Sequence, residues 1–351
     1  MKVEGRSYTS NHIKLLKHMD RLLEIQNRKS IRPIMLHVSP INACNLTCSF
    51  CCFANRDLTE RLSLEQMKDC ISQFRELGLS GVEFTGGGEP TLHPQFNDIV
   101  EFCYKLGLAV GLCTNGARLG KVENWEHFSW VRLGMYGFYE GYEYDLQPLR
   151  EKGVEISAAY VWDEAWKSSK NPNITGLWQS SKKKVKTKVL QESSKFFEML
   201  TWVENEKIPT RIAFNAIKDI SLVKKDINTI RGQLKEYETL RGPLEHAFLS
   251  DFNFKGERRN DHCYMHLIKP FLFTDGNVYV CPSAELSVEN NTNVNEEFKL
   301  CSWDKVSETY GQIVKSGLGY RRNHGCKFCK YAMQNELIDD IMIPTIHNEF
   351  A

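Results

Sequence analysis

The sequence has almost no excess of charge of either sign. It carries 45 lysines and arginines against 44 aspartates and glutamates, a formal net charge of +1. Such a chain has no global field that would recruit nucleic acid or an anionic membrane. It also lacks an apolar run close to the roughly 20 residues of a membrane-spanning helix, and its first residues contain no apolar signal-peptide core. We therefore expect a cytoplasmic protein.

The remaining composition is that of a folded protein with unusual cysteine usage. The chain has 351 residues, of which 42% are hydrophobic and 25% charged. This length suits one large domain and one smaller domain. Of the twelve cysteines, the majority fall into two groups with metal-like spacing. In an intracellular enzyme such groups indicate metal or redox chemistry rather than disulfides.

The first group is Cys44, Cys48 and Cys51, spaced C-x3-C-x2-C, with Phe50 before the last cysteine. Three thiolates on one short loop can hold a cubane iron–sulfur cluster by three corners. The fourth iron then remains open to a substrate or cofactor. Zinc fits less well, because a structural zinc takes four ligands and a catalytic zinc usually has histidine or carboxylate ligands. Cys52 is not expected to be a ligand, because adjacent residues rarely reach the same metal.

A glycine-rich stretch, Gly86-Gly87-Gly88-Glu89-Pro90, follows in the order expected for a second motif. Together the two motifs resemble the radical S-adenosylmethionine (radical SAM) superfamily. The resemblance implies that the open iron binds SAM, and that a 5′-deoxyadenosyl radical removes a hydrogen atom from the substrate. Many relatives carry a serine on the fourth strand, where this chain has Gly134. The implied SAM-binding residues are Gly87, Gly88 and Glu89, with Asn115 and Asn215 as further candidates.

Short apolar runs alternate with helical stripes along the chain, which predicts an α/β fold with a parallel sheet. Ser63 and Gln66 form a capping-box pattern that predicts the start of a helix ending near Gly78. Six strand–helix units resemble the partial (β/α)6 barrel of the radical SAM superfamily, in which chemistry lies at the C-terminal ends of strands. The predicted strands are 34–38, 82–85, 109–114, 130–133, 155–161 and 211–215.

The expected organisation has four parts. Residues 1–32 form an amphipathic helical extension, with Ile13, Leu16, Met19 and Leu23, and nearby Leu15 and Leu22, at helical spacing. Residues 33–220 form the barrel, 221–255 a helical linker and 256–351 a C-terminal domain. The segment after the fourth strand is rich in aromatics. It either lines a substrate pocket, with Tyr136, Tyr139 and Tyr142, or is an ordinary loop with buried aromatics.

The second cysteine group lies in the C-terminal domain, where Asp275-Gly276 between apolar runs predicts a β-hairpin. The order of cysteine, hairpin and C-x2-C resembles the auxiliary-cluster extension of SPASM and Twitch radical SAM enzymes. Four cysteines suffice for one further [4Fe–4S] cluster, as in the shorter Twitch form. A structural zinc site fits the bare spacing as well. The four candidate ligands are Cys263, Cys281, Cys326 and Cys329.

Three functions are compatible with these patterns. The first is a radical SAM enzyme that modifies a peptide or protein side chain. The second is radical rearrangement or ring formation on a nucleotide, a nucleobase-linked group or a small metabolite. The third is an iron–sulfur electron-transfer or sensor protein without SAM chemistry, against which the glycine-rich stretch argues. The first two functions, which are enzymatic, imply an electron donor such as flavodoxin or ferredoxin as a partner.

Overall fold

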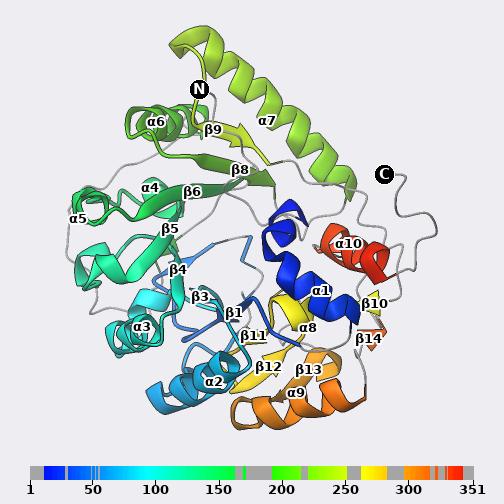
Figure 1. Cartoon of the computed structure of the whole chain (residues 1–351). Coiled ribbons are helices and arrows are strands. Elements are labelled where there is room, and N and C mark those ends of the chain that lie inside the picture. Colours follow the sequence, from blue (N-terminus) through cyan, green and yellow to red (C-terminus); the bar gives the residue numbers. More distant parts are fainter. Residues whose placement is uncertain are drawn as a thin grey trace.

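The computed structural model describes residues 12–27, 31–48, 50–51, 53, 56–162, 169–170, 192–214, 220–250, 262–282, 296–316, 321–322, 329 and 331–342. At its centre is one ten-stranded sheet with the order β13-β12-β11-β1-β3-β4-β5-β6-β8-β9. The sheet is curved, and Figure 1 shows α2, α3, α5 and α6 along its outer side. Its two end strands, β13 and β9, do not pair with each other, so the barrel is open.

The barrel strands run parallel from β1 to β9. Each of the six predicted strands overlaps an observed strand, and the partial (β/α)6 barrel is confirmed. The seventh parallel strand, β9, was not predicted, because three residues are too short to show a period. The bounds are β1 (Met35–Val38), β3 (Gly81–Phe84), β4 (Ala109–Thr114), β5 (Phe128–Gly134), β6 (Glu155–Trp162), β8 (Thr210–Phe214) and β9 (Ala247–Leu249).

The helix after β1 begins and ends as the sequence predicts. Ser63 caps α2 (Leu64–Glu76) in a complete capping box with Gln66, and Gly78 follows with φ of 97°, which favours glycine. In α3 (Phe96–Lys105) the apolar stripe Phe96, Ile99, Val100 and Cys103 is buried. The other helices of this region are α4 (Tyr136–Tyr139), α5 (Gln147–Glu151), α6 (Glu192–Asn205), α7 (Ile220–Arg241) and the 3-10 turns η3 (Pro90–Leu92), η4 (Leu119–Lys121) and η5 (Trp125–His127).

The two faces of the barrel sheet differ in character. Successive residues of a strand point to opposite faces. Leu36, Val82 and Val110 belong to the set that packs into the apolar core with the outer helices. The alternate residues on the same strands include the polar His37, Glu83 and Cys113, which the parallel register places on the inner face.

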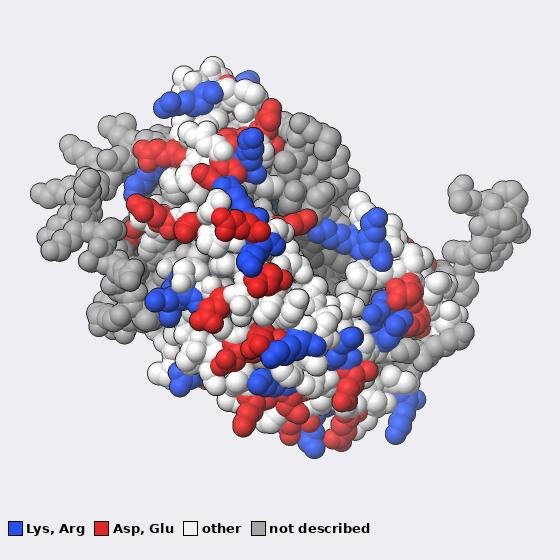
Figure 2. Space-filling model, turned by 60° about the vertical axis from the view of Figure 1, so that its left-hand side comes forward, with Lys and Arg blue, Asp and Glu red and all other residues white. Residues whose placement is uncertain are grey.

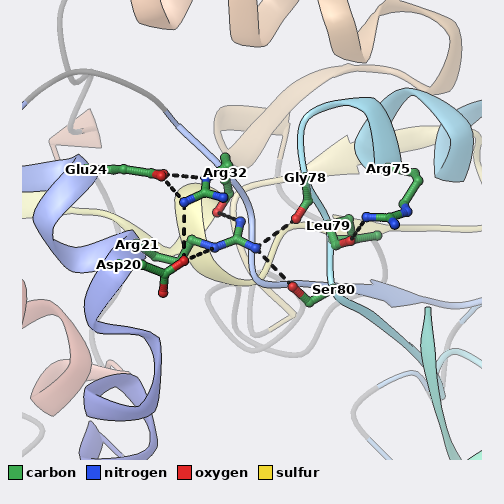
Figure 3. Close-up of polar contacts among 8 residues, drawn as sticks. All are labelled: Asp20, Arg21, Glu24, Arg32, Arg75, Gly78, Leu79 and Ser80. Carbon is green, nitrogen blue, oxygen red and sulfur yellow. Dashed lines mark hydrogen bonds and ion pairs between the residues drawn. The ribbon is translucent and has the colours of Figure 1, made fainter. Parts of the chain in front are cut away.

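The N-terminal helices are fixed to the N-terminal end of β3. They are η2 (His12–His18) and α1 (Met19–Asn27). The Arg21 guanidinium donates to the carbonyl of Gly78 at 3.0 Å and to Ser80 Oγ at 3.1 Å. Arg32, after α1, pairs with both Glu24 and Asp20 of that helix, as Figure 3 shows.

The predicted packing of this extension is partly wrong. Leu15, Leu22 and Ile25 are buried. Four other apolar residues that were expected to share this face are 42–48% exposed: Ile13, Leu16, Met19 and Leu23. Residues 12–18 form a 3-10 helix, whose 3.0 residues per turn shift the faces relative to an α-helix.

The C-terminal region extends the same sheet. β11 (Phe271–Leu272) pairs in parallel with β1, and the predicted hairpin joins it to β12 (Asn277–Tyr279). Gly276 at the turn has φ of 80°. The remaining elements are β13 (Lys299–Ser302), α8 (Met265–Ile268), η8 (Glu296–Phe298), η9 (Trp303–Lys305), α9 (Val306–Lys315), α10 (Ala332–Met342), and the two-stranded pairs β10 (His262–Cys263) with β14 (Arg321–Arg322) and β2 (Leu46–Thr47) with β7 (Ser169–Lys170).

The two ends of the described chain meet beside the barrel. Helices α1 and α10 lie next to each other (Figure 1), and Gln26 Nε2 donates to the carbonyl of Ile341 at 3.2 Å. Acidic and basic side chains are mixed over the outer face drawn in Figure 2. Of the helices that could be assessed in the described residues, none has both the length and the apolar content needed to cross a membrane.

Candidate active site

The cysteine motif lies just after the C-terminal end of β1, as the resemblance predicts. The backbone N–H of Cys51 donates to the carbonyl of Cys48 at 3.0 Å, so the loop turns tightly between its last two cysteines. Cys44, Cys48 and Cys51 are thiols of intermediate exposure. The strand end therefore presents three sulfur ligands on one compact loop.

The glycine-rich stretch packs directly against this loop. The backbone N–H of Gly87 donates to Ser39 Oγ at 2.7 Å. A Cβ atom on Gly88 would lie far inside contact distance of the Ala43 carbonyl, and one on Gly87 would overlap the Asn42 side chain. These glycines are thus required for the close approach of two protein segments. That their backbone also binds SAM stays a prediction.

Glu89 is a buried carboxylate that joins three segments. Its two oxygens accept four hydrogen bonds, from the backbone N–H and hydroxyl of Thr91, the Thr114 hydroxyl and the backbone N–H of Asn115. Its own N–H donates to the carbonyl of Ala43 at 2.9 Å. Burial raises the pKa of Glu89, and the hydrogen bonds oppose that shift only in part. Three of these donors bind Oε1 and one binds Oε2, so the carboxylate holds the three segments together. Its predicted contact with SAM stays a prediction.

Asn115, at the end of β4, extends this network to the cysteine loop. Its Nδ2 donates to Asn45 Oδ1 at 2.7 Å and lies 3.9 Å from Cys44 Sγ. Asn45 in turn donates to the Tyr142 hydroxyl at 3.2 Å. The structure therefore brings the predicted Glu89, Asn115 and Tyr142 together around Cys44. Asn45 was missed by the sequence reasoning, although it lies within the cysteine motif.

The three candidate pocket tyrosines lie in different surroundings. Tyr136 is half-buried, and its ring centroid lies 4.7 Å from that of Phe50 in the cysteine loop. A Cβ on Gly134 would come within 2.7 Å of the Tyr136 ring, so the glycine makes room for this ring over the strand end. Tyr139 instead stacks on Tyr160 at 5.4 Å. That side of the sheet packs against α6 through the aromatic residues Phe196 and Trp162.

Arg56 is a second residue that the motifs did not reveal. One guanidinium nitrogen lies 3.5 Å from Cys51 Sγ and 2.5 Å from the Phe53 carbonyl, and Nε donates to the Asn42 carbonyl at 2.6 Å. Burial raises the pKa of Cys44 to about 11, and Arg56 acts in the opposite direction. A cation beside thiols favours their thiolate forms, which are the forms that bind metal.

The donor set fits an iron–sulfur cluster. Three thiols, one adjacent arginine and no carboxylate or imidazole ligand in the motif form a soft, sulfur-only set of the kind that such clusters use. In the part of the chain that is described, no three histidine, cysteine or acidic side chains converge on one metal ion. The predicted Asn215, Cys52 and Cys326 lie outside the described residues.

The second cysteine group is described in part. Cys263 lies in β10, Cys281 is buried after β12, and Cys329 precedes α10. Asn335 of α10 connects two of these places, because its Oδ1 accepts from the N–H of Tyr264 at 2.8 Å and its Nδ2 lies 3.8 Å from Cys329 Sγ. The ends of β10 and α10 therefore meet next to two of the four predicted ligands.

Comparison with known proteins agrees with this geometry. The Radical SAM superfamily model matches residues 38–140. The S-adenosylmethionine-dependent nucleotide dehydratase of Flammeovirga pacifica is 31% identical over 101 residues, which cover 26% of this chain and 34% of the relative. The mycofactocin maturase MftC of Mycobacterium tuberculosis is 37% identical over 101 residues, which cover 28% of this chain and 25% of the relative.

A solved structure shows the same fold. Streptococcus suis SuiB bound to its precursor peptide SuiA aligns with a TM-score of 0.50 at 18% identity, covering 87% of this chain and 72% of that one. The chain spans about a third or less of the length of the curated relatives named above. The open barrel, the cysteine loop at its strand ends and the family match agree with one another: residues 38–140 are similar to the radical SAM superfamily, whose members use SAM and a [4Fe–4S] cluster.

Proposed function

We propose that this chain cleaves SAM reductively at a [4Fe–4S] cluster held by Cys44, Cys48 and Cys51, and uses the resulting radical to modify a peptide or protein side chain. The observation that carries the proposal is the network from Glu89 through Asn115 and Asn45 to the cysteine loop. It fixes the three thiols at the C-terminal ends of β1, β3 and β4, where barrel enzymes place their chemistry.

The chain's own residues would position and tune this site. When bound, the cluster and SAM supply a 5′-deoxyadenosyl radical that removes a hydrogen atom from the substrate. The Arg56 guanidinium stabilises negative charge on Cys51 Sγ at 3.5 Å. The rings of Phe50 and Tyr136 form an apolar contact beside the loop, which helps to exclude water from a reactive radical.

The peptide assignment is supported by relatives that are named as a maturase or a peptide cyclase. These include mycofactocin maturase MftC and a PqqA peptide cyclase that is 35% identical over 91 residues. A nucleotide substrate is the second candidate, supported by the two nucleotide dehydratases that match 101 and 84 residues. Each of these matches covers only about a quarter of the chain. They therefore support SAM binding more directly than they support either substrate.

An auxiliary [4Fe–4S] cluster on Cys263, Cys281, Cys326 and Cys329 forms part of the proposal. Four thiolates saturate such a cluster, so it would pass electrons or shape the substrate site without binding SAM. Its domain adds strands β11, β12 and β13 directly to the edge of β1. Flavodoxin or ferredoxin is the class of donor that we propose for the reducing electron.

The substrate class can be tested on protein purified without oxygen. Small molecules and peptides would be extracted from the chain, identified by mass spectrometry, and returned to it with SAM and dithionite. We expect a peptide whose modification consumes SAM and forms 5′-deoxyadenosine in proportion. Proportional turnover of a nucleotide, with none of any peptide, would replace the first candidate by the second.

A further inference from the structure

The inner face of the barrel carries a cluster of charged residues below the cysteine loop. It is formed by polar residues of β1, β3, β4, β5 and β8, together with Lys269 after α8. The parallel register aligns Cys113 with Arg132, and Arg132 with Ser157. On the next strand Ala159 aligns with Arg211. The set is His37, Glu83, Cys113, Arg132, Arg211 and Lys269.

The acidic member of this set is already neutralised. Glu83 Oε2 lies 2.8 Å from Lys269 Nζ and 3.6 Å from His37 Nδ1. Its other oxygen accepts from Cys113 Sγ at 3.5 Å. Burial would raise the pKa of Glu83, but Lys269 and then His37 hold that pKa well below its usual range. Glu83 and Lys269 therefore form an internal ion pair. Glu83 also acts electrostatically on Arg132 and Arg211, so one carboxylate faces three cations.

Arg211 has an unsatisfied atom within the described part of the chain. There its buried Nε has no hydrogen-bond partner, and no ion pair with a carboxylate is found for it. The groups that act on it electrostatically are Arg132, Tyr136, Cys113 and Glu83. Burial lowers the pKa of Arg211 and Arg132 lowers it further. A buried guanidinium nitrogen without an acceptor is costly for the fold.

Arg132 is held beside Arg211 by its own supports. Its guanidinium carbon lies 5.3 Å from the centroid of the Trp130 ring, within cation–π range. That ring fills the space over Gly111, where a Cβ would overlap it. Between the arginine strands, β6 presents only the small Ser157 and Ala159 at the matching levels. The outer face in Figure 2, by contrast, has mixed charges.

Lys14 adds a further positive charge at the N-terminal end of the barrel. It lies in η2, at the N-terminal end of the barrel strands, and Arg132 and Glu155 act on it electrostatically. Burial lowers the pKa of Lys14, and Arg132 lowers it further. Positively charged side chains thus follow one another from Arg211, nearest the strand ends, past Arg132 to the exposed Lys14 of η2.

We propose that Arg211, with Arg132 beside it, binds an anionic group of the substrate inside the barrel. This deepens the proposed function, on which it rests, by assigning the substrate a phosphate or carboxylate group. Because Arg211 aligns with Ala159, two residues beyond the Ser157 that faces Arg132, it lies closer than Arg132 to the C-terminal ends of the strands, the end at which the cysteine loop follows β1. Tyr136, which contacts Phe50 of that loop and acts on Arg211, lies between the two regions. An anion at Arg211 would therefore orient the rest of the substrate towards the SAM site.

The test is titration calorimetry of the anaerobic full chain with sodium tripolyphosphate and, separately, with glutarate, in low-salt buffer without phosphate. We expect at least one probe to bind, and Arg211→Gln to weaken that binding roughly tenfold or more. Arg241→Gln, an exposed arginine of α7, is the matched control and should bind as the wild type does. Preference for tripolyphosphate would indicate a phosphorylated substrate, and preference for glutarate a carboxylate-bearing one.

Thermal melting shows whether weaker probe binding by an Arg211 variant is caused by a folding defect. If Arg211 is kept for a ligand, Arg211→Met should melt at the same temperature as the wild type or higher, since it removes a charge whose buried Nε has no acceptor. The proposal would be overturned by a lower melting temperature of Arg211→Met or by the absence of binding by the wild type at millimolar probe. It would also be overturned if Arg211→Gln had unchanged probe affinity or lost affinity for SAM. Failure of the proposed function is a separate result, namely no 5′-deoxyadenosine from the wild type.

Discussion

The backbone N–H of Asn115 donates to the carboxylate of Glu89 at 2.7 Å, and this bond joins the ends of β3 and β4 beneath the cysteine loop. Both residues were predicted to contact SAM. In the structure the Glu89 carboxylate is occupied by protein donors, and the Asn115 side chain is bonded to Asn45. The glycine-rich motif therefore helps to fix the loop that carries the thiols, and its contact with SAM stays a prediction.

Glu89→Ala should destabilise the fold and reduce iron binding together. It removes the acceptor from four donors, and each buried donor left unsatisfied costs about 1–3 kcal/mol. Urea unfolding and iron analysis after anaerobic reconstitution measure the two effects. Glu65→Gln, an exposed carboxylate on α2, is the control. Normal iron content in Glu89→Ala would show that the network does not hold the loop.

Gly88→Ala should displace the cysteine loop. The added methyl group would overlap the Ala43 carbonyl, and such overpacking costs about 1–3 kcal/mol. We expect lower stability and less bound iron, measured as above. Gly120→Ala is the matched control, because a Cβ there meets nothing within 4 Å. Equal iron content in the two variants would contradict the close packing of these segments.

Arg56→Gln should weaken the cluster site while the fold remains intact. The variant removes the cation 3.5 Å from Cys51 Sγ, so the thiolate form of the loop loses stabilisation. We expect iron to be lost to a chelator faster than from the wild type, with an unchanged circular dichroism spectrum. Arg61→Gln, at an exposed position nearby, should behave as the wild type. Identical iron loss in both variants would remove Arg56 from the site.

Lys269→Met should destabilise the fold by about 3–5 kcal/mol, because it leaves Glu83 buried without its closest cation. In the wild type the lowered pKa of Glu83 contributes stability above about pH 4.3, the unperturbed value, which is lost as pH falls through the folded pKa. Without Lys269, burial should raise the pKa of Glu83. The destabilisation of the variant relative to the wild type should therefore grow as pH rises from about 4.3.

Urea unfolding of Lys269→Met at pH 5 and pH 7 measures this dependence. The double variant Glu83→Gln with Lys269→Met should recover much of the stability, since no buried charge then remains unpaired. A deficit that is equal at both pH values, or no recovery in the double variant, would show that the ion pair is not the cause.

Local patterns predicted what depends on neighbours in sequence. The cysteine loop, the capping box at Ser63 and the hairpin at Asp275-Gly276 all arise within a few residues, and each was found as predicted. Contacts between distant residues left no such signal. Asn45 meets Tyr142 across 97 positions, and Lys269 meets Glu83 across 186. The polar inner face of the barrel was not predicted, because its residues alternate with apolar ones over strands of only a few residues.

The two cysteine groups should be separable. Cys326→Ala with Cys329→Ala is expected to remove the auxiliary cluster, about half of roughly eight irons, and to retain some SAM cleavage while product formation falls sharply. Anaerobic assays of 5′-deoxyadenosine and product, with circular dichroism to check folding, measure this. Full coupling of the two at the wild-type rate would exclude the auxiliary site from catalysis, and zinc in that site would exclude the cluster.

The most direct test of the central claim is 5′-deoxyadenosine formation by the anaerobically reconstituted chain with SAM and dithionite. The wild type should form 5′-deoxyadenosine and methionine slowly even without substrate. The variant in which Cys44, Cys48 and Cys51 are all alanine should form none and should lose about half of the bound iron. Equal 5′-deoxyadenosine formation by the variant and the wild type would contradict the account.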